Sequence, residues 1–158
     1  MTAQITIRVV GMDDVLVRLN QEIRRIKGRS VKGLLKGAMR ILRTAKMITP
    51  VDLGNLRNSG FVVWGKGTGQ AQDRKDENFV GEAGAKVKLE TNMAVQQVSA
   101  FAQGQREPFA AVGYGASYAL YVHENLLVKH TVGRAKFLEE AMIDNFDAVL
   151  NDVEEAVE

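Results

Sequence analysis

The chain has 158 residues, 46% of them hydrophobic and 25% charged, which is sufficient for one domain with a single core and makes a second independent domain unexpected. It contains no cysteine, which excludes disulfides and thiolate metal sites, and no apolar run reaches the roughly 18 to 20 residues that span a bilayer, so we expect no membrane segment. The net charge of +2 conceals a basic first third, +8 over residues 1–48, and an acidic end, −6 over residues 134–158.

The first 50 residues predict one strand and then helices. Residues 4–10 alternate with the period of two that is typical of a half-buried strand, and they lack the continuous apolar stretch of a secretion signal. Asp13 is a candidate N-cap for an amphipathic helix, which Gly28 interrupts, and Ser30 is a candidate cap for a second helix. The second helix should end just before Pro50, which disfavours helical geometry in the residue that precedes it. Either two helices or one bent helix fits this pattern.

A corner should follow and lead into a β-rich middle. Asp52 is placed to accept hydrogen bonds from the amides of a turn that includes Gly54, and Leu56 returns an apolar anchor to the core. Residues 61–64 are compact and β-prone, whereas residues 65–78 are rich in Gly, Gln and charge and predict a flexible loop. Three weaker strand candidates follow, beside a stretch, Ala94–Phe101, that fits a helix equally well: Phe79–Gly81, Lys86–Leu89 and Met93–Val98.

The last third predicts a strand, a short helix and a long helix. Pro108 starts a β run over residues 109–114, and Ser117 is a candidate cap for a short helix that holds Tyr118 and Tyr121. From residue 135 onward, an apolar stripe at helical spacing leaves an acidic outer face; it comprises Phe137, Leu138, Ala141, Met142, Phe146, Val149, Leu150 and Val153. The sum predicts a single α+β domain over residues 1–158, with the long N-terminal helix or helix pair and the C-terminal helix packed on one side of a small antiparallel or mixed β-sheet.

No motif in the chain carries recognisable chemistry. His123-Glu124 opens a zinc-protease motif, but the second His that this motif needs three residues after the Glu is replaced by Leu127. The glycines of residues 65–69 lack P-loop spacing, residues 113–115 lack the third glycine of a dinucleotide fingerprint, and no Gly-x-Ser-x-Gly elbow exists. We therefore expect no enzyme activity, no cofactor and no metal, with His123 at the edge of the core or at a subunit contact.

Basic residues crowd the first helical region, where ten Lys and Arg lie between residues 18 and 46. Such a row could contact DNA phosphates without reading sequence, although it carries no aromatic residue and no DNA-binding motif accompanies it. Alternatively, the basic and acidic ends of the chain face each other, either between helices of one chain or between subunits. The candidate DNA or subunit contacts are Arg24, Arg25, Arg29, Lys32, Lys36 and Arg40.

Three short motifs stand far apart in the chain: Thr49–Ser59, Tyr118–Glu124 and Gly133–Leu138. Their order and spacing resemble the small tail-completion proteins of tailed bacteriophages, a family also described as head-to-tail joining, neck or minor capsid proteins. Two residues depart from the family pattern, because Leu53 replaces a common Thr and Lys136 stands where many relatives have Pro. The matching positions are Pro50, Asp52, Gly54, Leu56, Tyr118, Ala119, Tyr121, Val122, Phe137 and Leu138.

The resemblance implies a structural protein that completes the tail and joins it to the connector under the head, as a ring that often has six subunits around the DNA channel. The implied partners are further copies of this chain, tail-tube or tail-terminator proteins, head-connector proteins, and DNA in the channel through non-specific contacts. The implied location is the head–tail interface of the virion, after assembly in the host cytoplasm. In such a head-to-tail ring, the basic N-terminal helix of one subunit would face the acidic C-terminal helix of the next, or else line the channel. The alternative function is a DNA-contacting phage accessory protein that uses the basic helices.

Overall fold

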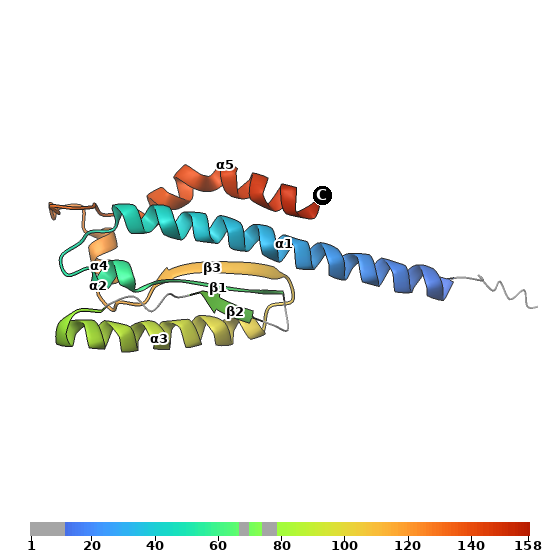
Figure 1. Cartoon of the computed structure of the whole chain (residues 1–158), viewed down its shortest axis with the longest axis horizontal. Helices are drawn as coiled ribbons and strands as arrows, with labels where there is room; N and C mark the ends of the chain where they lie inside the picture. Colours follow the sequence, from blue (N-terminus) through green and yellow to red (C-terminus); the bar gives the residue numbers. More distant parts are fainter. Residues whose placement is uncertain (1–11, 67–69, 74–78) are drawn as a thin grey trace, which may run out of the picture.

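The computed structural model of the chain describes residues 12–66, 70–73 and 79–158 and arranges them in four layers (Figure 1). The C-terminal helix lies on the long N-terminal helix, which covers one face of a three-stranded sheet, and a third long helix covers the other face. The α+β class is confirmed. The strand predicted over residues 4–10 lies outside the described residues. In chain order the elements are α1 (Met12–Ile48), α2 (Asn55–Asn58), β1 (Gly60–Lys66), β2 (Gln70–Asp73), α3 (Gly81–Gln103), β3 (Pro108–Tyr114), α4 (Ala119–Glu124) and α5 (Phe137–Val157).

Helix α1 is one continuous helix, so the single-helix alternative is confirmed and Gly28 does not interrupt it. A glycine inside a helix costs only about 1 kcal/mol relative to alanine, which the packing of the rest of this helix outweighs. Ser30 caps nothing, because it lies in mid-helix and its hydroxyl donates to the carbonyl of Ile26, four residues earlier, at 2.9 Å. The predicted end before Pro50 is confirmed. At that end the buried Thr49 hydroxyl donates to the carbonyl of Ala45 at 2.6 Å.

The corner after α1 is closed by a glycine rather than by Asp52. Gly54 is the N-cap of α2 with a φ of 82°, a left-handed conformation that glycine adopts without strain, and no side chain caps this helix. The predicted hydrogen bonds from the turn amides to Asp52 do not occur among the described residues, and the Asp52 side chain is exposed. Asn55 ties the corner to the start of α3, since its carbonyl oxygen accepts from the Val80 amide at 2.8 Å while its amide group donates to the Val80 carbonyl at 3.1 Å.

The sheet is antiparallel in the order β2-β1-β3, with Val62 of β1 opposite Val112 of β3. Because side chains alternate along β1, Val62 packs against α1, whereas Phe61 and Val63 pack against α3. Part of the predicted loop over residues 65–78 is wrong, because it supplies the end of β1 and the edge strand β2. The rest of that stretch, residues 67–69 and 74–78, lies outside the described residues.

Helix α3 takes the place of the strand candidates Lys86–Leu89 and Met93–Val98, which are wrong, and the helical alternative for Ala94–Phe101 is confirmed. The candidate Phe79–Gly81 is also wrong, because Phe79 and Val80 precede the helix outside any strand. Val87, Thr91 and Val95 recur every four residues and are all buried, so they form the helical stripe that packs beneath the sheet. The candidate strands are short runs of residues, and the four-residue spacing of the buried side chains over the whole segment shows that it is a helix. The predicted N-terminal and C-terminal helices do lie on one side of the sheet, and helix α3, which was not predicted as a whole, covers the other face.

Helix α5 begins at Phe137, as the Phe-Leu motif predicts, and packs along α1 on the side away from the sheet (Figure 1). Two glycines spaced by four residues allow this close approach. A Cβ on Gly33 would lie 2.6 Å from the Cα of Val153, and one on Gly37 would lie 2.7 Å from a methyl group of Val149. The short helix α4 begins after Tyr118 without a side-chain cap, so the predicted cap role of Ser117 is wrong.

Candidate interaction surfaces

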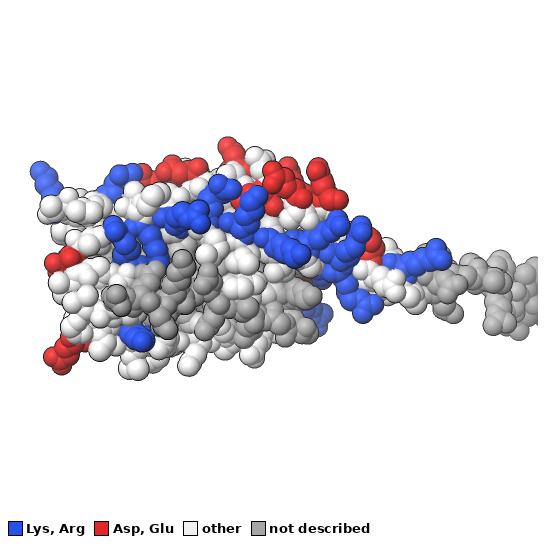
Figure 2. All heavy atoms as spheres, viewed as in Figure 1, with Lys and Arg blue, Asp and Glu red and all other residues white. Residues whose placement is uncertain are grey.

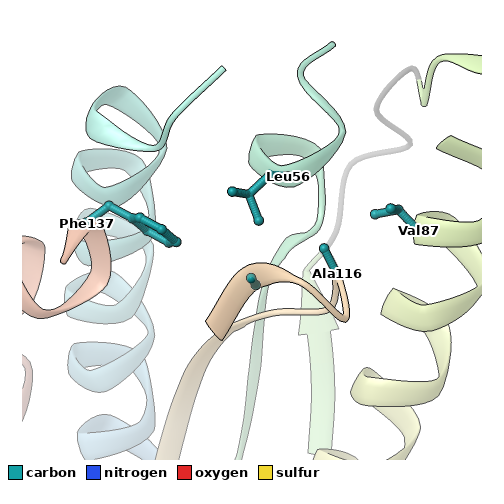
Figure 3. Packing of buried hydrophobic residues seen from close by; sticks show 5 residues of the cluster. Leu56, Val87, Ala116 and Phe137 are labelled. Atoms are coloured by element: carbon teal, nitrogen blue, oxygen red, sulfur yellow. The ribbon is translucent and has the colours of Figure 1, made fainter. Parts of the chain in front are cut away.

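The three motifs, distant in sequence, meet at one end of the molecule, where α2, α4 and the start of α5 surround a buried cluster (Figure 3). Phe137 is its largest side chain, 1% exposed, and its ring makes edge contacts with Tyr114 and His123 at centroid distances of 5.0 and 4.9 Å. The motif residues Leu56, Ala119 and Phe137 are therefore buried core residues that hold this end of the domain together. The cluster comprises Leu56, Val87, Ala116, Ala119 and Phe137.

Other motif residues line a surface cleft of about 500 Å³ beside this cluster. Pro50, Asp52 and Gly54 form one side, and Tyr118 faces them from the start of α4. Partial burial is the main cause that raises the pKa of Tyr118, and the carboxylates of Glu90 and Asp52 add to it. Tyr121 is 68% exposed and Leu138 is half-buried at the same end of the molecule. The cleft and these two side chains therefore form a surface that a partner could contact.

The segment that joins α4 to α5 crosses over the C-terminal end of α1. Gly133 has a φ of 80°, and a Cβ there would lie 2.5 Å from the backbone nitrogen of Pro50, so only glycine fits the crossing. The Arg134 amide then donates to the free carbonyl of Ile48 at 3.0 Å. Lys136 has a φ of 58°, which proline cannot adopt, so a proline at this position would require a different backbone conformation.

His123 lies at the edge of the core, as predicted. Its Nδ1 lies 2.7 Å from Glu124 Oε1, and its Nε2 lies 3.4 Å from the Glu139 amide at the start of α5. The ammonium group of Lys136 lies 2.6 Å from the Glu124 carboxylate and 3.0 Å from the Glu139 carboxylate. Its hydrogen bond to Glu124 is the main cause that lowers the pKa of Glu124. Within the described ranges, no three His, Asp or Glu side chains gather closely enough to hold a metal ion, and no helix is sufficiently long and apolar to cross a membrane.

The basic row on α1 divides into residues that bind α5 and residues that do not. Figure 2 shows Lys and Arg side chains as a band along α1, with acidic side chains above it on α5. Arg29 donates to the Val157 carbonyl, and Lys36 and Arg40 reach the carboxylates of α5, so these three candidate contacts are used within the chain. Arg24, Arg25 and Lys32 have no contact with α5. Half of the predicted contact set therefore remains for a partner.

Asp152 is the buried anchor of this intramolecular pairing, with only 4% of it exposed. Lys36 Nζ lies 2.7 Å from one carboxylate oxygen, and the Arg40 guanidinium donates to both oxygens at 3.0 and 3.1 Å. The hydrogen bonds from these two cations lower the pKa of Asp152, despite its burial. The sequence pattern had placed Asp152 on a solvated acidic face. The spacing of Gly33 and Gly37 is the sequence signal for its burial, because two small residues four apart mark the face of α1 on which α5 packs closely.

Two exposed surfaces combine apolar and charged side chains. The first, here called the projecting helix, is residues 17–26 of α1, which extend beyond the body of the molecule and are all exposed (Figure 1). The second, here called the α5 groove, is an open hollow of about 520 Å³ that runs along one side of α5, next to α1. Exposed apolar surface of this kind is typical of protein interfaces. The groove is lined by Ile41, Met142, Ile143, Phe146, Asp147 and Val149.

The sequence pattern missed the α5 groove. It placed Met142, Phe146 and Leu150 in the buried stripe of the last helix, but they are 53%, 62% and 47% exposed. The residues that pack on α1 include Val149 and Val153 of the predicted stripe, together with Ala141 and the polar Asp152. Large apolar residues on the outer face of a helix point to a further contact partner.

No protein-family model, curated protein or solved structure matches this chain.

Proposed function

We propose that this protein is a virion structural protein of a tailed bacteriophage that completes the tail and joins it to the head connector, as a ring around the DNA channel. The proposal rests on the ordered motifs Thr49–Ser59, Tyr118–Glu124 and Gly133–Leu138, whose resemblance to tail-completion proteins is stated above. Its partners are further copies of this chain, tail-tube or tail-terminator proteins, and head-connector proteins.

One observation carries the structural side of this proposal: the described part of the chain exposes two unlike surfaces on different elements. The projecting helix is basic and apolar, and the α5 groove is acidic and apolar. In a head-to-tail ring every subunit must offer two different surfaces that fit each other. A protein that acts alone gains nothing from such surfaces and risks aggregation through them.

Deletion of the gene from the phage, with complementation by the unchanged chain as control, tests this function. We expect a loss of infectious yield, with DNA-filled heads and separate tails in electron micrographs, because the joint between them is missing. Complementation should restore joined particles. An undiminished yield of intact virions after deletion would refute the assembly role.

A second candidate function, direct DNA contact, is favoured by the cations that remain free. Among the described residues, Lys32 and Arg43 have no ion-pair partner, and both are exposed on α1. Binding through phosphates would weaken steeply with salt and would not depend on sequence. Fluorescence anisotropy with an arbitrary duplex separates the two functions. Tight, strongly salt-dependent binding by the isolated protein favours DNA contact, whereas assembly without duplex binding favours the joining role.

A further inference from the structure

We propose that the projecting helix of one copy docks into the α5 groove of a second copy, so that copies of this chain join head to tail. This inference rests on the proposed assembly function and specifies the surface that would carry it. The occupant of the groove is thus the N-terminal part of α1 from a neighbouring copy.

The projecting helix has an apolar face that none of the described residues covers. Leu19, Ile23 and Ile26 are spaced four and three residues apart, so they share one face, and they are 53%, 42% and 41% exposed. By helical spacing Glu22 and Lys27 border this face, and Arg18 and Arg25 lie beyond Glu22, with which Arg25 pairs at 2.7 Å. The segment therefore offers a narrow apolar stripe with a net positive charge.

The α5 groove offers the complementary chemistry. Met142, Ile143 and Phe146 expose 53%, 69% and 62% of their surface on the outer side of the helix. Among the described residues, Asp147 and Glu154, on the same outer side, have no basic partner. An apolar stripe on a segment of net positive charge thus meets an apolar groove with a negative rim. Pairing two projecting helices, or two grooves, would instead bring like charges together.

The geometry prevents a chain from docking onto itself. Both surfaces belong to elements fixed along α1, since α5 packs on it and Ile41 of α1 itself lines the groove. Ile23 lies 18 residues before Ile41 in the same continuous helix, which separates them by about 27 Å at about 1.5 Å per residue. Contact between Ile23 and the groove can therefore only come from another copy.

The size of the contact predicts how assembly behaves. Ten residues of helix span about 15 Å, and one face of such a helix covers only a few hundred Å², against about 800 Å² per partner in a stable pair. A single contact should therefore be weak and strongly dependent on concentration. Closure into a ring, in which every copy makes the contact twice, would stabilise the assembly.

Because the chain has no cysteine, single introduced cysteines report the contact directly. The full-length variants Ile23→Cys and Phe146→Cys, both at exposed positions, are mixed and treated with a short bis-maleimide cross-linker. We expect a heterodimeric product in the mixture, identified by mass, and little product from either variant alone. Val17→Cys is the matched control, because its 54% exposed side chain lies on the opposite side of the same helix and should cross-link to Phe146→Cys far less.

A charge test accompanies the cross-link. Reversal of Arg24 and Arg25 to Glu should lower the yield of the Ile23–Phe146 product by about tenfold, and adding Asp147→Lys on the groove variant should restore part of it. Efficient cross-linking of either variant with itself would show like-to-like pairing and overturn the proposal. Absence of the mixed product, or equal product with the Val17 control, would overturn it as well.

The outcomes separate this contact from the proposed function. If the protein is found in virions and its deletion separates heads from tails, yet the mixed product is absent, the docking is wrong and the assembly role stands. If the mixed product forms but deletion leaves the infectious yield unchanged, the docking stands and the proposed function is wrong.

Discussion

The same substitution at two glycines of α1 should have opposite effects on stability. Alanine is favoured over glycine inside a helix by about 0.5–1 kcal/mol. At Gly28 an added Cβ meets nothing within 4 Å, so Gly28→Ala should raise the free energy of unfolding by about that amount. At Gly33 the same Cβ would lie 2.6 Å from the Cα of Val153 and 2.7 Å from the carbonyl oxygen of Asp152.

Both neighbours of Gly33 are backbone atoms, so the overlap cannot be relieved by turning a side chain. Helix α5 must move away from α1, which loosens the buried ion pair of Asp152 with Arg40. Overpacking of this kind costs about 1–3 kcal/mol. After the gain in helix propensity, Gly33→Ala should still lower the free energy of unfolding by about 1–2 kcal/mol. Because the gain in helix propensity is common to both, the two variants should differ by the overpacking cost alone, about 1–3 kcal/mol, for an identical chemical change.

Urea denaturation of the two variants and the parent chain, followed by circular dichroism at low protein concentration, measures this difference. Equal slopes of the unfolding free energy against urea would show that the change lies in stability rather than in the extent of unfolding. If Gly33→Ala were as stable as Gly28→Ala, the close packing of α5 on α1 described above would be refuted.

Three further predictions concern the charges. Asp152→Asn should lower the free energy of unfolding by about 2 kcal/mol, less than for a fully buried pair because its cationic partners can regain water; Glu155→Gln, at a 70% exposed carboxylate, should match the parent in the same urea titration. Because the pKa of Asp152 is lowered in the folded chain, its stabilisation is complete above the unfolded pKa of about 3.9 and is lost as the pH falls through the folded pKa. Unfolding measured from neutral to acidic pH should therefore show a shallower acid loss for Asp152→Asn, and parallel curves would contradict the role of this carboxylate. Salt near 1 M, where the screening length is about 3 Å, should reduce the Ile23–Phe146 cross-link several-fold, and an unchanged yield would argue against charge complementarity.

Features that depend on one local rule could be predicted from the sequence. The end of α1 follows from Pro50, the central strand from the β-prone residues 61–64, and the start of α5 from Phe137. The α+β class follows from the order of these elements. Each of these residues restricts the backbone at its own position or at its immediate neighbours, so the resulting structure does not depend on contacts with distant segments.

The features that the pattern missed depend on contacts between distant segments. Edge strand β2 resembles a loop in sequence, and only its pairing with β1 defines it as a strand. Helix α3 contains short alternating runs that resemble strands. It forms a helix because its buried residues, spaced four apart, pack against the sheet. Asp152 has the composition of a surface residue and is buried only because Gly33 brings the helices together and two cations neutralise it.

Immunogold labelling of purified virions with antibodies against this chain tests the proposed building-block role most directly. We predict label confined to the junction between head and tail, on nearly every particle, and lost from particles made without the gene. Virions that are infectious and intact but contain no copy of the chain, by labelling and by mass spectrometry, would contradict the proposed function.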